Sequence, residues 1–191
     1  MQQINLPFEV QPSSVAETFD SSQPPVDIVQ ELAMRKAKDI ALQSSDALVI
    51  GADTLVVFRD RILEKPSEAG EAKQMLLELS GQTHQVLTGV ALCKVDSSHN
   101  ITDSTTFFES TDVIFGDLNP SNIKAYVAGG SPMDKAGSYG IQDDFGAIFV
   151  RRIEGDYYNV VGFPLHSFYN VMESFAPEFL RHLKLDEKTD E

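Results

Sequence analysis

Two absences in this 191-residue sequence narrow the classes of protein to which it can belong. A single cysteine, Cys93, excludes an internal disulfide framework and a metal site built from several cysteines. No apolar run approaches the ~20 residues that a membrane helix needs, and the first ten residues have neither the basic region nor the apolar stretch of a secretory signal. We therefore expect a soluble, cytoplasmic protein that has no membrane partner.

Basic residues are also scarce. The chain carries 15 Lys and Arg against 29 Asp and Glu, a formal net charge of −14, and no basic residue precedes Arg35. Nucleic acids and anionic membrane surfaces bind basic surfaces, so the charge argues against both as partners. It does not exclude a small phosphorylated ligand, which a few local lysines can hold.

What is present indicates an ordinary globular domain, because 42% of the residues are hydrophobic and 23% are charged. Helical and strand-like patterns alternate along the chain, which favours an α/β fold with a mixed sheet. Apolar periodicity and capping residues predict helices at about 27–43, 67–81, 120–128 and 164–183. Strands are expected at 47–50, 55–58, 85–95, 105–115 and 147–153. We assign residues 1–185 to one domain and 186–191 to an acidic tail.

Gly51 to Thr54 place a carboxylate and a hydroxyl at an expected break between two apolar strand segments. An aspartate inside such a run is costly to bury unless it is paired or binds a metal. Asp53 is therefore a candidate functional residue. The alternative is that it closes a turn through its own backbone.

Three lysines stand where a phosphate could be bound, although each also has a structural explanation. Lys36 lies near the core-facing side of the first predicted helix, where a lysine is unusual unless its ammonium reaches solvent. Lys65 follows a short strand and precedes a proline. Lys135 lies with Gln142 in a stretch rich in turn residues, which is either a site or a surface loop. Judged alone, Glu17 is an exposed acid.

Several separated segments together resemble the Maf family of nucleoside triphosphate pyrophosphatases, and they keep the order and spacing of that family. These segments are LPFEV (6–10), LAMRKA (32–37), IGADTLVV (50–57), ILEKP (62–66), AKQMLLELSGQTHQVLTGVAL (72–92), PMDKAGSYGIQ (132–142) and EGDYYNVVGFPL (154–165). The resemblance spans roughly residues 5 to 183. It implies a fold similar to that of inosine triphosphate pyrophosphatases, with a mixed central sheet and two lobes that flank a deep cleft.

The resemblance also implies a reaction. A nucleoside triphosphate would be hydrolysed to the monophosphate and pyrophosphate with the help of a divalent metal, Mg²⁺ or Mn²⁺. Asp53 matches the catalytic acid that accepts a proton from water, and Glu17 and Asp53 match the metal-binding positions. Thr54 and Gln142 match the substrate-selecting positions.

The phosphate-facing lysines of the family correspond to Lys36, Lys65 and Lys135. Thr54 and the Ile141–Gln142 pair resemble the subgroup that acts on dTTP and UTP more than the subgroup that acts on 7-methyl-GTP. We therefore expect pyrimidine substrates, modified ones included, and leave a homodimer open.

One departure supports a second hypothesis. The family begins with a strand and a loop of pattern S-x-S-P-R-R, whereas this chain starts five residues before Leu6 and lacks both arginines. Charge-assisted hydrogen bonds contribute roughly 1.5–3 kcal/mol each, so we expect impaired activity and a gain when that loop is restored. The alternative function is a catalytically weak or inactive nucleotide-binding or partner-binding domain.

Overall fold

The computed structural model of the chain describes residues 4–142 and 145–183. Its centre is a five-stranded sheet in the order β2-β1-β3-β4-β5. The strands are β1 (Ala47–Phe58), β2 (Arg61–Leu63), β3 (Thr83–Val95), β4 (Ile101–Phe115) and β5 (Val150–Glu154). Each neighbouring pair is antiparallel. The α/β class is therefore confirmed, but within the described residues the sheet is antiparallel rather than mixed.

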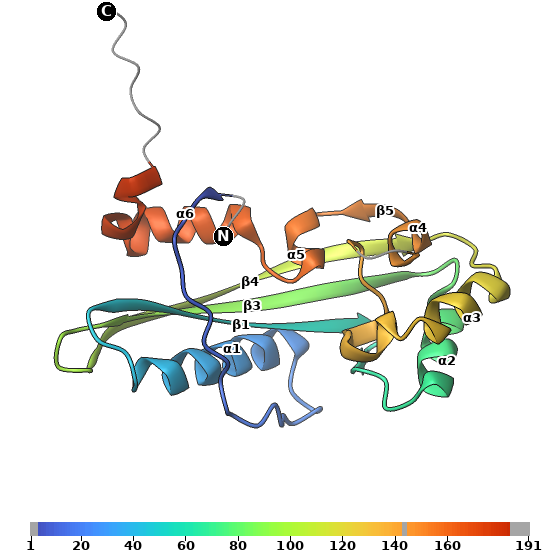
Figure 1. Cartoon of the computed structure of the whole chain (residues 1–191), viewed down its shortest axis with the longest axis horizontal. Helices are drawn as coiled ribbons and strands as arrows, with labels where there is room; N and C mark the ends of the chain where they lie inside the picture. Colours follow the sequence, from blue (N-terminus) through green and yellow to red (C-terminus); the bar gives the residue numbers. More distant parts are fainter. Residues whose placement is uncertain (1–3, 143–144, 184–191) are drawn as a thin grey trace, which may run out of the picture.

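Helices lie on both sides of this sheet, as Figure 1 shows. Helix α1 runs along one face, α5 and α6 lie on the other, and α2 and α3 are gathered at one end. The helices are α1 (Pro25–Ala41), α2 (Ala69–Leu79), α3 (Pro120–Ala128), α4 (Gly146–Phe149), α5 (Tyr157–Val161) and α6 (Leu165–Phe175), with 3-10 turns η2 (Ser131–Asp134), η3 (Ala136–Ser138) and η4 (Pro177–Leu183). No helix in the described ranges is long and apolar enough to cross a membrane.

Two glycines allow α1 to lie directly on the sheet. A Cβ added at Gly51 of β1 would stand 2.3 Å from the carbonyl oxygen of Ala33, and one at Gly89 of β3 would stand 2.3 Å from that of Val29. Such a distance is far inside van der Waals contact, so only glycine permits the helix backbone to approach this closely. The predicted break at Gly51 is therefore wrong, because β1 continues through it for 12 residues.

Most of the other element predictions are confirmed within a few residues. Asn119 caps α3 by accepting a hydrogen bond from the backbone N–H of Ser121, with Pro120 in the first turn as expected. The strand expected at 147–153 was partly wrong, since α4 covers its first residues and β5 begins at Val150. Helix α5 was missed, and the acidic tail at 186–191 lies outside the described residues. Cys93 is fully buried among aliphatic side chains, as a core residue would be.

The core divides according to the alternation of side chains along β1 and β3. On one face, Leu55 and Leu87 pack with the first turns of α1. On the other face, Val90 and Leu92 pack with α6. Asp53 follows the parity of Leu55, whereas Thr54 follows that of the opposite face. Two consecutive polar side chains of β1 thus point to opposite sides of the sheet.

Candidate active site

A cavity of about 440 Å³ opens at the edge of the sheet beside β1. Strand β2 pairs only with Val56 to Phe58, so among the described strands the outer edge of β1 has no neighbour from Ala47 to Leu55. At such an edge one cavity can receive side chains from both faces. It is lined by polar and apolar residues of distant segments: Glu17, Phe19, Leu32, Lys36, Ala52, Asp53, Thr54, Leu55, Val56, Glu64, Lys65, Val86, Asp134, Lys135, Ala136, Tyr139, Gly140, Gln142, Val160, Val161 and Gly162.

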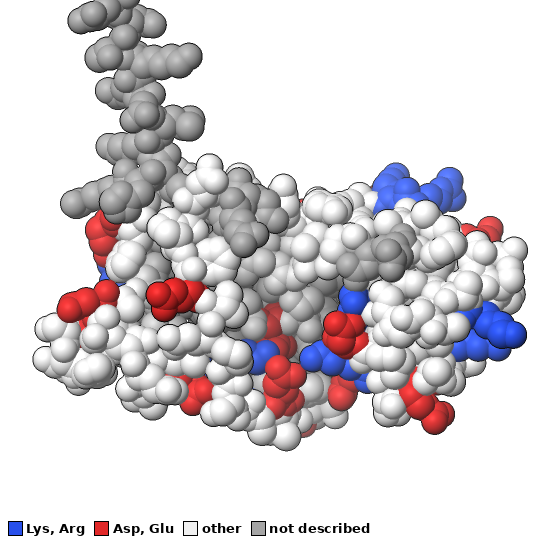
Figure 2. Space-filling model, in the orientation of Figure 1, with Lys and Arg blue, Asp and Glu red and all other residues white. Residues whose placement is uncertain are grey.

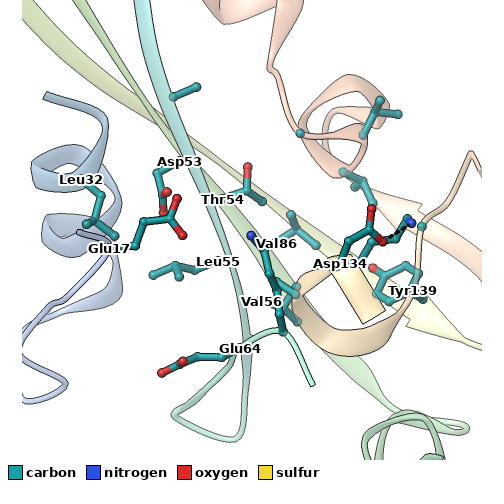
Figure 3. Close-up of a pocket in the computed structure, with 18 of the residues that line it drawn as sticks. Glu17, Leu32, Asp53, Thr54, Leu55, Val56, Glu64, Val86, Asp134 and Tyr139 are labelled. Carbon is teal, nitrogen blue, oxygen red and sulfur yellow. Dashed lines mark hydrogen bonds and ion pairs between the residues drawn. The ribbon is translucent and has the colours of Figure 1, made fainter. Parts of the chain in front are cut away.

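Charges of both signs meet in this cavity. Figure 2 shows acidic and basic side chains side by side in the hollow near the middle of this face. In Figure 3 the carboxylates of Glu17 and Asp53 point toward one another from different segments. A cavity that mixes cations with carboxylates is suited to an anionic ligand that also brings a cation.

Lys36 joins the two carboxylates. Its Nζ lies 2.5 Å from Oδ1 of Asp53 and 2.6 Å from Oε1 of Glu17. The side chain of Asp53 is only 9% exposed, while that of Glu17 is 53% exposed. The predicted position of Lys36 near the core-facing side of its helix is thereby explained, because the ammonium pairs with a carboxylate on the sheet beneath. Asp53 closes no turn and lies within β1.

The environment shifts the pKa of all three groups. Burial raises the pKa of Asp53 above its ordinary value, although the hydrogen bond and charge of Lys36 oppose this. The hydrogen bond from Lys36 lowers the pKa of Glu17. Burial alone would lower the pKa of Lys36, but its hydrogen bonds to Asp53 and Glu17 outweigh that effect and raise it. A carboxylate with a raised pKa is suited to accept a proton.

Two further lysines face the same cavity from other segments. Lys65 follows β2, and its charge favours the ionised forms of Glu17 and Asp53. Lys135 lies between η2 and η3, where its Nζ donates to the carbonyl oxygen of Ser131 at 2.8 Å and to Oδ1 of Asp134 at 2.7 Å. The side chain of Asp134 is 79% exposed, so an arriving anion can compete with it for this ammonium.

The opposite face of the sheet contributes Thr54 to the cavity. Thr54 is linked through Thr88 to Asn159 of α5, and Val160 to Gly162 at the end of that helix also line the cavity. Gly162 has a φ of 117°, a left-handed conformation that ends α5 and that glycine adopts without strain. The cavity thus receives Asp53 from one face of β1 and the hydroxyl of Thr54 from the other.

The residues present fit a divalent cation only in part. Glu17 and Asp53 both contact the ammonium of Lys36, so two carboxylates face the same part of the cavity. Within residues 4–142 and 145–183, no group of three His, Cys, Asp or Glu side chains is arranged to hold a metal ion. Mg²⁺ is commonly held by one or two carboxylates together with substrate phosphates. The donor set fits that kind of site.

All seven residues predicted from the sequence line this one cavity: Glu17, Lys36, Asp53, Thr54, Lys65, Lys135 and Gln142. Their roles stay predictions, as does the division into two lobes beside a deep cleft. Phe19, Glu64 and the end of α5 also line the cavity, and no sequence pattern predicts them as site residues. The segment at 154–165 resembles the family as a whole, but no single residue in it stands out without the fold.

Comparison with known proteins places the chain in a family. The family model of the Maf-like proteins matches residues 1–175. A dTTP/UTP pyrophosphatase of Bacillus cereus (strain AH820) is 48% identical over 170 residues, which cover 89% of this chain and 85% of that protein. The protein of the same name from Bacillus cereus (strain AH187) is 47% identical over 171 residues, covering 90% and 86%. A protein of that name from Bacillus anthracis is 48% identical over 170 residues, covering 89% and 85%. This chain belongs to the Maf family.

Proposed function

We propose that this protein hydrolyses dTTP, UTP and modified pyrimidine nucleoside triphosphates to the monophosphate and pyrophosphate. The observation that carries the proposal is the buried Asp53, paired with Lys36 and Glu17 in a cavity that Lys65 and Lys135 also line. The relatives named dTTP/UTP pyrophosphatases support the choice of substrate.

Asp53 acts as the general base. Its carboxylate takes a proton from water as the water oxygen attacks the α-phosphorus. The bond between this phosphorus and the oxygen bridging to the β-phosphorus then breaks, and pyrophosphate leaves. The pKa of Asp53, raised by burial, makes the carboxylate a stronger base than an exposed aspartate. A positioned base of this kind contributes roughly 10²–10⁴-fold to a rate.

The lysines hold the triphosphate against this base. Lys36, Lys65 and Lys135 surround the cavity with ammonium groups that can contact phosphate oxygens as point charges. Glu17 and Asp53 would hold a divalent cation, which when bound offsets phosphate charge and orients water. Lys36 then positions both carboxylates, since it contacts each of them.

The experiment is a pyrophosphate-release assay with dTTP and UTP in the presence of Mg²⁺ or Mn²⁺. We expect equal amounts of monophosphate and pyrophosphate, and a loss of about 10²-fold or more in kcat for Asp53→Asn. Asp103→Asn is the matched control, because Asp103 is exposed on β4 and lies outside the cavity. Inorganic phosphate as the first product would contradict the proposal.

The same assay tests the alternative of a catalytically weak or inactive binding domain. In that case the folded protein binds UTP in a calorimeter but releases no pyrophosphate with either metal. Equal traces of turnover in the protein and its Asp53→Asn variant would lead to the same conclusion.

A further inference from the structure

Thr54 makes one polar contact that decides how its hydroxyl can act. Its Oγ1 lies 2.9 Å from Oγ1 of Thr88, the residue directly opposite on β3. Either hydroxyl could donate in that pair when it is viewed alone. Thr88 is fully buried, whereas Thr54 is half-buried and lines the cavity. The direction of this bond therefore determines what Thr54 offers to a ligand.

A third group favours one direction. Thr88 Oγ1 also donates to the backbone carbonyl oxygen of Asn159, at 3.4 Å, and a carbonyl oxygen can only accept. A hydroxyl has one proton, so a Thr88 hydroxyl that donates to Asn159 cannot also donate to Thr54. Thr54 must then be the donor in the pair with Thr88. With its proton used, Thr54 presents only lone pairs to the cavity.

Asn159 is held firmly enough to maintain this arrangement. Its side chain is fully buried and its Nδ2 donates to the carbonyl oxygen of Val86 at 2.9 Å and to Oγ1 of Thr111 at 3.0 Å. Thr111 in turn exchanges hydrogen bonds with the backbone of Asp156, just before α5. Asn159, whose carbonyl oxygen accepts the hydrogen bond from Thr88, is thus fixed to two strands through its side chain.

Gln142, which lines the same cavity, does not have this property. Its amide offers both a donor and an acceptor and can rotate to suit either partner. Discrimination between ring edges of opposite hydrogen-bond polarity therefore needs a group that cannot adapt. Thr54 is such a group.

We propose that Thr88 and Asn159 are specificity-positioning residues that fix the Thr54 hydroxyl as an acceptor for the N3–H of uracil or thymine. This rests on the proposed function. In a uracil or thymine nucleotide, N3–H is the one N–H donor of the ring. Cytosine has an unprotonated N3 at that position, and it would face the lone pairs of Thr54.

The test compares UTP with CTP in the native protein and in Thr88→Val, which keeps the shape of the side chain but removes its hydroxyl. An unpaired acceptor costs about 1–3 kcal/mol, so we expect UTP to be preferred about tenfold or more in kcat/KM. In Thr88→Val the Thr54 hydroxyl loses its acceptor, so it can donate a hydrogen bond to cytosine N3. The rate with CTP should then rise in absolute value and the preference should fall to about threefold or less.

Thr88→Ser is the matched control, because serine retains the hydroxyl and should keep the native preference. A merely structural role of Thr88 would lower both rates in Thr88→Val and could not raise the rate with CTP. The carbonyl oxygen of Asn159 still accepts from the backbone N–H of Gly162 in the variant, at 2.9 Å, so α5 retains a hydrogen bond at its end. Melting curves of the three proteins check their folding.

Binding of UMP and CMP, measured by calorimetry, makes the outcome independent of catalysis. UMP should bind more tightly than CMP to the native protein, and the two affinities should converge in Thr88→Val. Pyrophosphate release with equal rates for UTP and CTP would overturn this inference and leave the proposed function standing. Absence of turnover together with a UMP preference that Thr88→Val removes would overturn the proposed function alone. Absence of nucleotide binding would overturn both.

Discussion

Lys36 is the residue that holds the two carboxylates of the cavity together, because its ammonium is shared between Glu17 and Asp53. Without it, two carboxylates would face one another in a partly buried place. Like charges at short distance disfavour ionisation, so each would hold its proton more strongly. Lys36 therefore acts on the basicity of Asp53 as well as on a bound phosphate.

We expect Lys36→Met to lower kcat/KM for UTP by about tenfold or more, since a charge-assisted hydrogen bond contributes roughly 1.5–3 kcal/mol. The pH dependence of kcat/KM in this variant is the more specific test. Removing the ammonium raises the pKa of Asp53, so the acidic limb of kcat/KM should move to higher pH. Lys124→Met, a change at an exposed residue of α3 outside the cavity, should leave the limb in place. An unchanged limb in Lys36→Met would argue against Asp53 as the base.

His84 lies under the segment that carries Lys135 and Gln142. Its Nε2 is 2.8 Å from the hydroxyl of Tyr139, both rings are buried, and both pack edge-on against Phe115. Burial lowers the pKa of His84 to about 4. The imidazole is therefore neutral in the folded protein and gains a proton more readily when the chain unfolds.

His84 makes the free energy of unfolding depend on pH. Between pH 6.5 and about 4 the unfolded chain binds the proton and the folded chain does not, so stability falls as the pH falls through that window. The whole effect is about 3 kcal/mol, from 1.36 kcal/mol for each pKa unit. We expect the difference in unfolding free energy between the native protein and His84→Gln to change by about 2 kcal/mol between pH 7 and 5. Urea titrations at both pH values measure it, and parallel pH dependences would contradict it.

At the scale of elements, the contact between α1 and the sheet depends on space at two glycines. Gly51→Ala would place a Cβ 2.3 Å from the carbonyl oxygen of Ala33 and 2.6 Å from the backbone nitrogen of Ala37. Helix α1 would have to move away from β1, taking Lys36 with it. We expect a loss of about 3 kcal/mol or more in the free energy of unfolding, near the upper end for overpacked sites.

Gly70→Ala is the control for that prediction. Gly70 is in the first turn of α2, where an added Cβ would meet only the carboxylate end of the Glu68 side chain, at 3.2 Å. Alanine favours a helix over glycine by about 1 kcal/mol, so this variant should be as stable as the native protein or more so. Guanidinium titrations compare the two variants. A Gly51→Ala protein as stable as Gly70→Ala would show that α1 does not need this close approach.

The same glycine shows where prediction from sequence ends. A glycine within an apolar run indicates either a break or a close approach of another backbone, and only the position of α1 decides between them. Asp53 is easier to predict as a functional residue, because a carboxylate in a buried strand requires a partner whatever the fold. Its partner Lys36 is predictable for the complementary reason, because a lysine on the core-facing side of a helix also requires a partner.

The contacts behind Thr54 are harder to predict. Thr88 and Asn159 carry no unusual local pattern, and threonine is a common strand residue. Their importance comes from the pairing register of β1 with β3 and from the packing of α5 on that pair. Both are long-range features, and the residues involved are 71 positions apart. Residue types alone could not join them.

At the scale of the whole molecule, the net charge of −14 opposes compaction. The Debye length falls from about 30 Å at 0.01 M salt to about 8 Å at 0.15 M, so repulsion between distant acids is largely screened at the higher concentration. We expect the Tm to rise by a few degrees between 10 and 150 mM NaCl. Differential scanning calorimetry measures this, with an equal osmolality of sucrose as the control. A Tm that falls with salt would mean that local ion pairs outweigh the long-range repulsion.

The opposite orientation of Asp53 and Thr54 has a consequence for how such an enzyme can diverge. The residue assigned to hydrolysis faces α1, and the residue assigned to base selection faces α5, although they are neighbours in β1. Mutations behind Thr54, at Thr88 or Asn159, can therefore retune which base is accepted while the carboxylate and its lysine stay untouched. A one-residue insertion or deletion in this strand would exchange the two faces and abolish both roles at once. The substrate preference of such an enzyme can thus change by point substitution, but not by a shift in the register of β1.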